Sequence, residues 1–185
     1  MLVKSPESDT TSLRDATFTD LPRLQEIERQ AGEVFRDVGM NEVADDEPLS
    51  LELLRSYVER GQAWVITDHV DVPVAYLLAD VVEGAGHVEQ VSVIPGYARQ
   101  GLGRLLLDHA CEWAIGQALR AVTLTTFANV AWNAPYYERC GFRRLSADDF
   151  TPGLLRIRRE EAEHGLDAWP RVCMRRLLAE PNILD

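Results

Sequence analysis

Residues 91–110 read VSVIPGYARQGLGRLLLDHA, and the character of the chain changes three times within them. The alternating residues from Val91 predict a strand, because successive strand side chains point to opposite faces of a sheet. Pro95 predicts the end of that strand, since proline has no N–H to donate to a neighbouring strand. Leucines after Gly101 and Gly103 recur at three- and four-residue steps, which predicts a helix that begins at the glycines. The stretch therefore predicts a strand, a glycine loop and a helix in succession.

The glycine loop is typical of a phosphate-binding site. The first N–H groups of a helix have no intrahelical acceptor, and the peptide dipoles place partial positive charge there. Gly101 and Gly103 have no side chain to keep a phosphate away from these amides, and Arg99 and Arg104 flank them. The loop is neither a P-loop, because Arg104 and not Lys-Ser/Thr follows, nor a dinucleotide fingerprint, because it has only two glycines and lies in mid-chain. A plain turn before a helix is the alternative.

The composition of the whole chain predicts a single globular domain. Of its 185 residues, 46% are hydrophobic and 26% are charged, which is ordinary globular usage. We expect a flexible tail at residues 1–12 and one domain at residues 13–185. The net charge of −11 argues against nucleic acid or anionic lipid as a partner. No apolar run approaches the roughly 20 residues that span a bilayer, and the N-terminus lacks the apolar core of a secretion signal.

Three cysteines, Cys111, Cys140 and Cys173, lie far apart in the sequence. A disulfide framework normally needs an even number of cysteines, and no pair here has the spacing of metal ligands. We therefore expect reduced thiols in a cytoplasmic protein, and no metal site.

The hydrophobic periodicity predicts an α/β fold with a mixed sheet and helices on both faces. Strands are predicted at residues 13–18, 63–67, 73–82, 87–93, 121–126, 142–145 and 171–177. Helices are predicted from Pro22 with an apolar stripe as far as Val38, and at residues 50–60, from 102 onward, at 133–139 and at 154–164. In the second helix, Leu53, Leu54, Tyr57 and Val58 are predicted to share the apolar face. The central strands follow one another as a meander, so the sheet is not purely parallel.

Two separated motifs resemble those of one protein family. The V-x-V-x-P strand, the RQGLGR loop and the leucine-rich helix are together similar to the acyl-CoA signature of the GNAT superfamily of N-acetyltransferases. WNAPYYERCGF, residues 132–142, resembles the later motif of that family, in which a short helix ends in Tyr-x-x-x-Gly-Phe, and residues 171–177 resemble its closing strand. The resemblance extends over about residues 13–178. One position departs from it, because the first arginine or glutamine of the family loop falls on Ala98, and Arg99 follows one residue late.

The resemblance implies a GNAT-like acyl-CoA N-acyltransferase fold, with about seven strands that splay apart at the cofactor site. The pantetheine arm of the cofactor would lie along the strand at 87–93 like an added strand. Asn133 resembles the asparagine of the family that contacts the cofactor, and Asn129 is an alternative. The resemblance places the following residues at the cofactor: Val91, Ser92, Val93, Arg99, Gln100, Gly101, Leu102, Gly103, Arg104 and Asn133.

Acetyl transfer to an amine first requires the loss of a proton from an ammonium group whose pKa is about 10. We predict Glu89 as the base, because strand alternation places it on the same face as Val91 and Val93. A solvated or ion-paired carboxylate is the alternative, and His87 is a second candidate for the base. Glu28, beside the apolar stripe of the first helix, either meets a substrate amine or lies at a solvated helix edge.

The thiolate that leaves is stabilised by a proton donor, and the resemblance selects Tyr137 for that role. Tyr137 precedes Gly141 by the four residues of the family motif. Packing of its ring in the core is the alternative. Tyr136 is the adjacent rival, and the two side chains diverge by about 100° on a helix.

Together the residues and the resemblance imply an N-acetyltransferase that transfers the acetyl group of acetyl-CoA directly to a primary amine, with no metal. A non-catalytic acyl-CoA-binding or sensing domain is one alternative. An enzyme that acetylates protein lysines or N-termini is another. The expected partners are a small-molecule or peptide amine and, as the default for an oligomer, a second copy of the chain.

Overall fold

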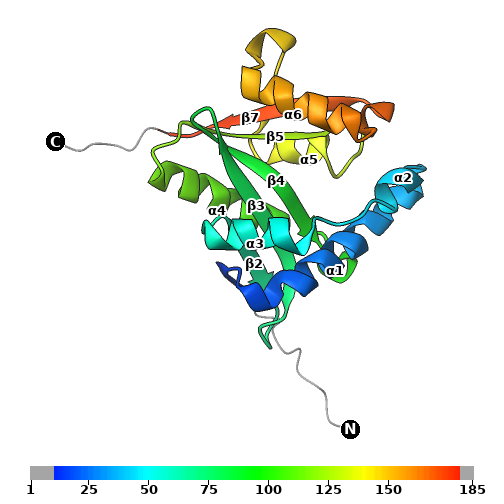
Figure 1. Ribbon diagram of the computed structural model, residues 1–185, viewed down its shortest axis with the longest axis vertical. Helices are drawn as coiled ribbons and strands as arrows, with labels where there is room; N and C mark the ends of the chain where they lie inside the picture. The colour runs from blue at the N-terminus through cyan, green and yellow to red at the C-terminus, as the bar shows by residue number, and fades with distance from the viewer. Residues whose placement is uncertain (1–10, 180–185) are drawn as a thin grey trace, which may run out of the picture.

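Seven strands form one sheet at the centre of the fold in the computed structural model, which describes residues 11–179 (Figure 1). The strands are β1 Ser12–Asp15, β2 Ala63–Thr67, β3 Pro73–Val82, β4 Ala85–Val93, β5 Ala121–Phe127, β6 Arg143–Arg144 and β7 Arg171–Leu177. Their order across the sheet is β1-β2-β3-β4-β5-β7-β6. Only the β4–β5 pair is parallel, so the predicted mixed sheet of seven strands is confirmed.

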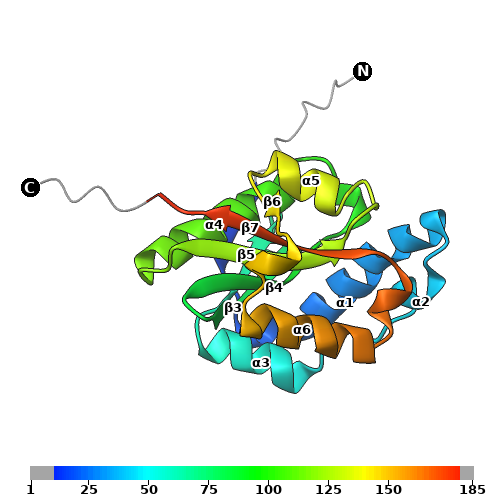
Figure 2. The same cartoon turned by 90° about the horizontal axis from the view of Figure 1, so that it is seen from above.

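Helices cover both faces of the sheet. They are α1 Leu21–Gly32, α2 Asn41–Ala44, α3 Leu51–Glu59, α4 Leu102–Gly116, α5 Ala134–Arg139 and α6 Pro152–Glu163. Figure 2 shows α1, α3 and α6 on one side of the sheet and α4 and α5 on the other. Strand β3 separates two cores by alternation, because Leu77 packs toward α4 and Leu78 packs toward α1 and α3. No helix within residues 11–179 is long and apolar enough to cross a membrane.

Capping residues fix several helix ends, and α6 begins two residues before its predicted start at Leu154. The hydroxyl of Ser50 accepts a hydrogen bond from the N–H of Leu53 at 3.2 Å, and that of Thr151 accepts one from Leu154 at 3.3 Å. Gly61 follows α3 in the left-handed region, with φ of +66°. The two hydroxyl groups accept hydrogen bonds from N–H groups that have no acceptor within the helix, and Gly61 turns the chain away after α3. The starts of α3 and α6 and the end of α3 are therefore determined by nearby residues.

Three predictions about the N-terminal half are wrong in detail. The first helix ends at Gly32, and Glu33–Val38 continue as a 3₁₀ helix, which shifts the apolar stripe and leaves Val38 48% exposed. Leu53 is 41% exposed, because α3 docks through Leu54 and Tyr57 instead. The short helix α2 has no counterpart in the prediction. Residues 1–10 of the predicted tail and 180–185 of the predicted domain lie outside the described residues, and Ser12 already belongs to β1.

Gly153 lies where α6 meets the turn between β3 and β4. A Cβ atom at this position would lie 2.6 Å from Cγ1 of Val82 and 2.9 Å from Oε2 of Glu83. Alanine is normally favoured over glycine inside a helix by about 1 kcal/mol, but overpacking costs about 1–3 kcal/mol. We expect Gly153→Ala to lower the free energy of unfolding by about 1 kcal/mol, measured by urea denaturation.

The matched control is Gly116→Ala, at the end of α4, where an added Cβ would meet no atom within 4 Å. That variant is expected to be as stable as the wild type or more stable. A Gly153→Ala protein with unchanged stability would contradict this prediction, because it would show that α6 and the β3–β4 turn can move apart without any loss in the free energy of unfolding.

Candidate active site

Strands β4 and β5 separate soon after they begin. They pair at only three positions, from Gly86 with Val122 to Val88 with Leu124. Beyond these pairs the two strands diverge (Figure 1), while β4 stays bonded to β3 and β5 to β7. Within the described residues, the edge of β4 that faces β5 therefore has no strand partner from Glu89 onward. A free strand edge presents N–H and C=O groups to an extended ligand. The predicted splay is confirmed.

The first turn of α4 lies at the same end of the sheet as the splay. Gly101 is the N-cap, with φ of +83°, and the first N–H bonded within the helix is that of Leu105, to the carbonyl of Gly101 at 3.0 Å. No side chain caps this end, so the N–H groups of residues 102–104 are available to a ligand. Arg99 is also left-handed, with φ of +61°, and such alternation gathers backbone N–H groups into an anion-binding concavity.

Side chains around this turn add positive charge. Arg99 is exposed and has no ion-pair partner among residues 11–179. Arg104 makes only a long contact, 3.7 Å, to Asp108. Gln100 donates a hydrogen bond from its side chain back to the carbonyl of Gly96 at 3.3 Å. The loop therefore combines unoccupied amides with guanidinium groups that carboxylates leave largely unneutralised.

Four of the predicted cofactor residues offer the site only their main chain. Val91 and Val93 pack against the core under α4, and Leu102 is buried in that core. The buried hydroxyl of Ser92 faces the other side of the sheet, where it accepts a hydrogen bond from Gln90 at 2.9 Å.

Glu89 is the extra residue of a β-bulge. Along β3, Leu78 pairs with Gln90 and the next residue, Ala79, pairs with Val88, so Glu89 has no partner of its own. A bulge of this kind re-aims a side chain and breaks the alternation of the strand. The prediction that Glu89 shares a face with Val91 and Val93 is therefore wrong.

The electrostatic neighbours of Glu89 identify the face that it does occupy. They are the carboxylates of Asp80 on β3, Glu160 and Glu161 on α6, and Glu28 on α1. Asp80 itself accepts hydrogen bonds from the hydroxyl of Tyr57 on α3 at 2.5 Å and from Arg60 at 3.1 Å. Glu89 thus faces the side of α1, α3 and α6, opposite the core under α4.

This setting changes the acidity of Glu89. Its side chain reaches solvent, but the surrounding walls desolvate the carboxyl group, and the nearby carboxylates of Asp80 and Glu161 disfavour a further negative charge. Together they raise the pKa of Glu89 from 4.5 to about 7. A general base works best when its pKa lies near the operating pH.

His87, the second candidate for the base, is 2% exposed. Its Nδ1 lies 2.9 Å from the hydroxyl of Thr123, in the region where β4 and β5 still pair. Burial lowers the pKa of this imidazole to about 4, so it is neutral at pH 7. A buried ring of this kind has a structural role and does not meet an amine from solution.

The two tyrosines of α5 diverge, as the helical geometry predicts. Tyr137 is buried, and its ring packs edge-on against Phe142 at 6.1 Å. Burial raises the pKa of its phenol, which has no hydrogen-bond partner among the described residues and stays a protonated donor. Tyr136 turns toward α4, where its hydroxyl lies 3.0 Å from the position that a Cβ atom of Gly103 would take. Glycine at 103 is therefore also required for the contact between α4 and α5.

Asn133 stands directly before α5. Its Nδ2 donates to the hydroxyl of Thr126 at 2.9 Å, whereas its Oδ1 is buried and has no donor within residues 11–179. A buried acceptor without a donor costs about 1–3 kcal/mol, so such atoms usually mark a bound ligand or water. Asn129, the alternative, is exposed.

Glu28 links three elements on the side of the sheet that Glu89 faces. Its Oε2 accepts hydrogen bonds from the buried hydroxyl of Tyr76 at 2.8 Å and from the N–H of Leu49 at 3.3 Å. Burial raises the pKa of Glu28. It therefore holds α1, β3 and the loop before α3 together, and is not a solvated helix edge.

The sequence did not predict the residues that lie close to Glu89 in space but far from it along the chain. Glu161 is fixed by Arg158 and Arg171, both at 2.5 Å, and by Thr125. An aromatic cluster closes the end of β5, with Phe127 lying 5.5 Å from Phe35 and 6.2 Å from Trp169 between ring centres. No pattern in the sequence of α6 indicates that Glu161 packs near Glu89, which lies far away along the chain.

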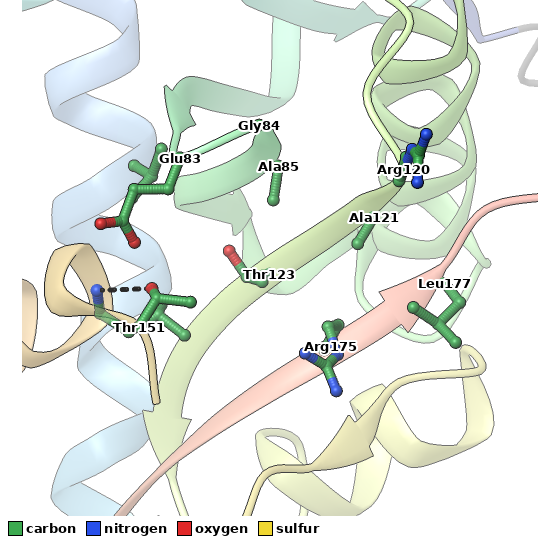
Figure 3. A pocket seen from close by; sticks show the side chains of 11 residues that line it. Glu83, Gly84, Ala85, Arg120, Ala121, Thr123, Thr151, Arg175 and Leu177 are labelled. Carbon is green, nitrogen blue, oxygen red and sulfur yellow. Dashed lines mark hydrogen bonds between the residues drawn. The ribbon is translucent and has the colours of Figure 1, made fainter. Parts of the chain in front are cut away.

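A cavity of about 280 Å³ lies elsewhere, between the β3–β4 turn, the start of β5 and the end of β7. Figure 3 shows Glu83 and Thr151 on one side of it and Arg120 and Arg175 on the other. It adjoins the end of β4 and β5 that remains paired, opposite the splay and the first turn of α4. No group of three or more potential metal ligands occurs in the described part of the chain. The candidate active site is therefore the splayed end of the sheet.

Comparisons with known proteins identify the family and agree with the fold. A sequence model described as Acetyltransferase (GNAT) family matches residues 21–142. The ribosomal-protein-S18-alanine N-acetyltransferase from Escherichia coli is similar in structure, with a TM-score of 0.64 at 20% identity over 95% of this chain and 99% of that one. The PaiA N-acetyltransferase from Thermoplasma acidophilum, solved in complex with coenzyme A, has a TM-score of 0.63 at 14% identity, over 91% and 99%. N-acetylglutamate synthase from Neisseria gonorrhoeae, complexed with coenzyme A and N-acetyl-glutamate, has a TM-score of 0.68 at 15% identity, over 94% of this chain and 36% of that one.

Proposed function

This chain belongs to the GNAT family of acetyltransferases, and on that premise we propose that it transfers the acetyl group of acetyl-CoA to a primary amine by direct attack. One observation carries the proposal: the free edge of β4, the uncapped turn of α4 and the carboxyl group of Glu89 all belong to the splayed end of the sheet. The family membership supports the use of an acyl-CoA, and the carboxylates around Glu89 favour an acceptor that arrives as a cation.

The residues present fit the cofactor. The N–H groups of Leu102, Gly103 and Arg104, with the guanidinium of Arg99, would hold its diphosphate. The free main-chain groups of β4 between Val91 and Val93 would pair with the amides of the pantetheine arm. The unpaired Oδ1 of Asn133 would accept a hydrogen bond from an N–H of the same arm.

The chemistry then needs two protons removed from the nitrogen and one delivered to the sulfur. Glu89 accepts a proton from the incoming ammonium, directly or through a water molecule, and so frees the lone pair of the nitrogen. A bond forms between this nitrogen and the acetyl carbon as the bond between carbon and sulfur breaks. Tyr137 donates its proton to the departing sulfur, which leaves as a thiol. The nitrogen then loses its second proton, directly or through water, to the phenolate of Tyr137, which restores the phenol. No covalent intermediate with the protein is involved.

The experiment has two stages. Coenzyme A is first titrated into the folded chain by calorimetry, and thiol release from acetyl-CoA is then assayed with polyamines, amino acids, aminoglycosides and peptides in separate reactions. We expect binding, and release with at least one class of small amine. Tight binding without release for any class would favour an acyl-CoA-binding domain, release with peptides alone would favour a protein acetyltransferase, and absence of binding would refute the proposal.

Asp80 is expected to set the pH dependence of this activity. Desolvation raises the pKa of Glu89 most and the carboxylate of Asp80 adds to that rise, so Asp80→Asn should lower the pKa part of the way toward its ordinary value of 4.5. The base then stays deprotonated at lower pH, and the acidic limb of the kcat/KM profile moves to lower pH. The measurement is the profile of both proteins between pH 5 and pH 9.

Asp148→Asn removes an equal charge from an exposed residue that makes no hydrogen bond to the site. It should leave the acidic limb in place. An Asp80→Asn profile that coincides with the wild type would mean that Glu89 is not the group that titrates.

A further inference from the structure

Arg139 is an unneutralised cation close to the phosphate-binding turn. The chain carries 30 acidic and only 19 basic residues, so a cluster of cations near one turn is a distinct feature of its charge distribution. Arg139 is exposed at the end of α5 and has no carboxylate partner among the described residues. Its Nη1 donates only to the carbonyl of Pro135, at 2.9 Å, which leaves the remaining guanidinium donors for a ligand.

Tyr136 connects Arg139 to the turn of α4. The carbon at the centre of the guanidinium lies 5.8 Å from the centre of the Tyr136 ring, within the range of a cation–π contact. The hydroxyl of the same ring lies against Gly103. The ring of Tyr136 therefore lies between Arg139 and the amides of the phosphate-binding turn. The cation–π contact holds Arg139 on the face of the ring that belongs to α5.

Arg104 approaches Tyr136 from the other helix. Arg104 follows Gly103, the residue against which the hydroxyl of Tyr136 lies. Burial raises the pKa of the Tyr136 phenol, and the positive charge of Arg104 opposes that rise. Two arginines therefore lie next to the contact between α4 and α5: Arg139 over the Tyr136 ring, and Arg104 directly after Gly103. Arginine pairs tightly with phosphate because its planar donors match two phosphate oxygens at once.

Resting on the proposed function, we propose that Arg139, assisted by Arg104, binds the 3′-phosphate of coenzyme A and so selects it over 3′-dephospho-coenzyme A. The diphosphate already has the main-chain amides and Arg99. A further pair of cations outside that turn matches a further phosphate on the same nucleotide. The arrangement lies in α5 and the first turn of α4, so it does not depend on which amine is the acceptor.

The test compares two ligands on two proteins. Dissociation constants for coenzyme A and 3′-dephospho-coenzyme A are measured by calorimetry on the wild type and on Arg139→Gln. We expect the wild type to bind coenzyme A about tenfold more tightly, the size of one charge-assisted hydrogen bond. Arg139→Gln should weaken coenzyme A by that factor and leave the dephosphorylated ligand unchanged, so that the preference disappears.

Two further variants sharpen the result. Arg159→Gln removes the same charge from α6, on the opposite side of the sheet, and should keep the tenfold preference. Arg139→Lys keeps the charge but loses the planar donors, and should keep part of it. Thermal unfolding of each variant checks that it is folded.

The outcomes separate this inference from the proposed function. An equal loss for both ligands in Arg139→Gln would assign the arginine to the diphosphate and overturn the inference, as would an unchanged preference. If the wild type binds neither ligand, the proposed function itself fails.

Discussion

Glu89→Gln is expected to lower kcat/KM at pH 8 by about 10²–10⁴, the usual contribution of a general base. The substitution keeps the shape of the side chain and removes only its ability to accept a proton. Because the pKa of Glu89 is raised to about 7, wild-type kcat/KM should fall as the pH drops below about 7, and this limb should be absent from the variant. Thiol release from acetyl-CoA across the pH range measures both effects.

The same substitution has an opposite effect on stability. The pKa of Glu89 is higher in the folded chain than its ordinary value of 4.5, so ionisation of the carboxyl group disfavours folding. This cost is absent below about pH 4.5, develops as the pH rises toward 7 and is complete above it. Glu89→Gln should therefore unfold at a higher temperature than the wild type at pH 8, with no difference from this source at pH 4.

Glu163→Gln, at the exposed end of α6, is the matched control and should change neither activity nor stability. Coenzyme A affinity should be the same in all three proteins. If Glu89→Gln keeps half of the wild-type activity at pH 8, Glu89 is not the base.

Tyr137→Phe is expected to lower kcat by about 10²-fold, near the lower end of what a proton donor contributes. Phenylalanine keeps the packing against Phe142 and removes only the unpaired hydroxyl. Because burial raises the pKa of this phenol, wild-type activity should show no alkaline limb from Tyr137 below about pH 10. The measurement is kcat at saturating acetyl-CoA.

Tyr136→Phe is the comparison for this prediction. Its hydroxyl already lies against Gly103, so its loss should lower kcat by less than the Tyr137 substitution does. A larger loss in Tyr136→Phe than in Tyr137→Phe would exchange the roles of the two tyrosines.

Local signals in the sequence predicted most of the fold. The bounds of β2, β3 and β7 agree with the prediction, because alternating apolar residues and turn residues mark them without reference to the rest of the chain. The helix that begins after Gly101 was predicted for the same reason: a left-handed glycine and uncapped amides are consequences of the local sequence.

The environment of Glu89 was beyond the sequence because it depends on other strands. The bulge is a mismatch in register between β3 and β4, which is settled by how the two strands pair and not by either alone. The carboxylates of Asp80 and Glu161, which raise the pKa of Glu89, come from β3 and α6. The acidity of Glu89 is thus a tertiary property, whereas the identity of the residue is a local one.

The extra residue in β4 has a kinetic consequence if the proposed function holds. It directs Glu89 toward α1, α3 and α6, while Val91 and Val93 keep their side chains under α4. The strand then separates the cofactor from the side that Glu89 faces, so the two reactants approach it from opposite faces. Acetyl-CoA and the amine can therefore be bound at the same time. Initial velocities should give the intersecting double-reciprocal lines of a sequential mechanism and not the parallel lines of a ping-pong mechanism.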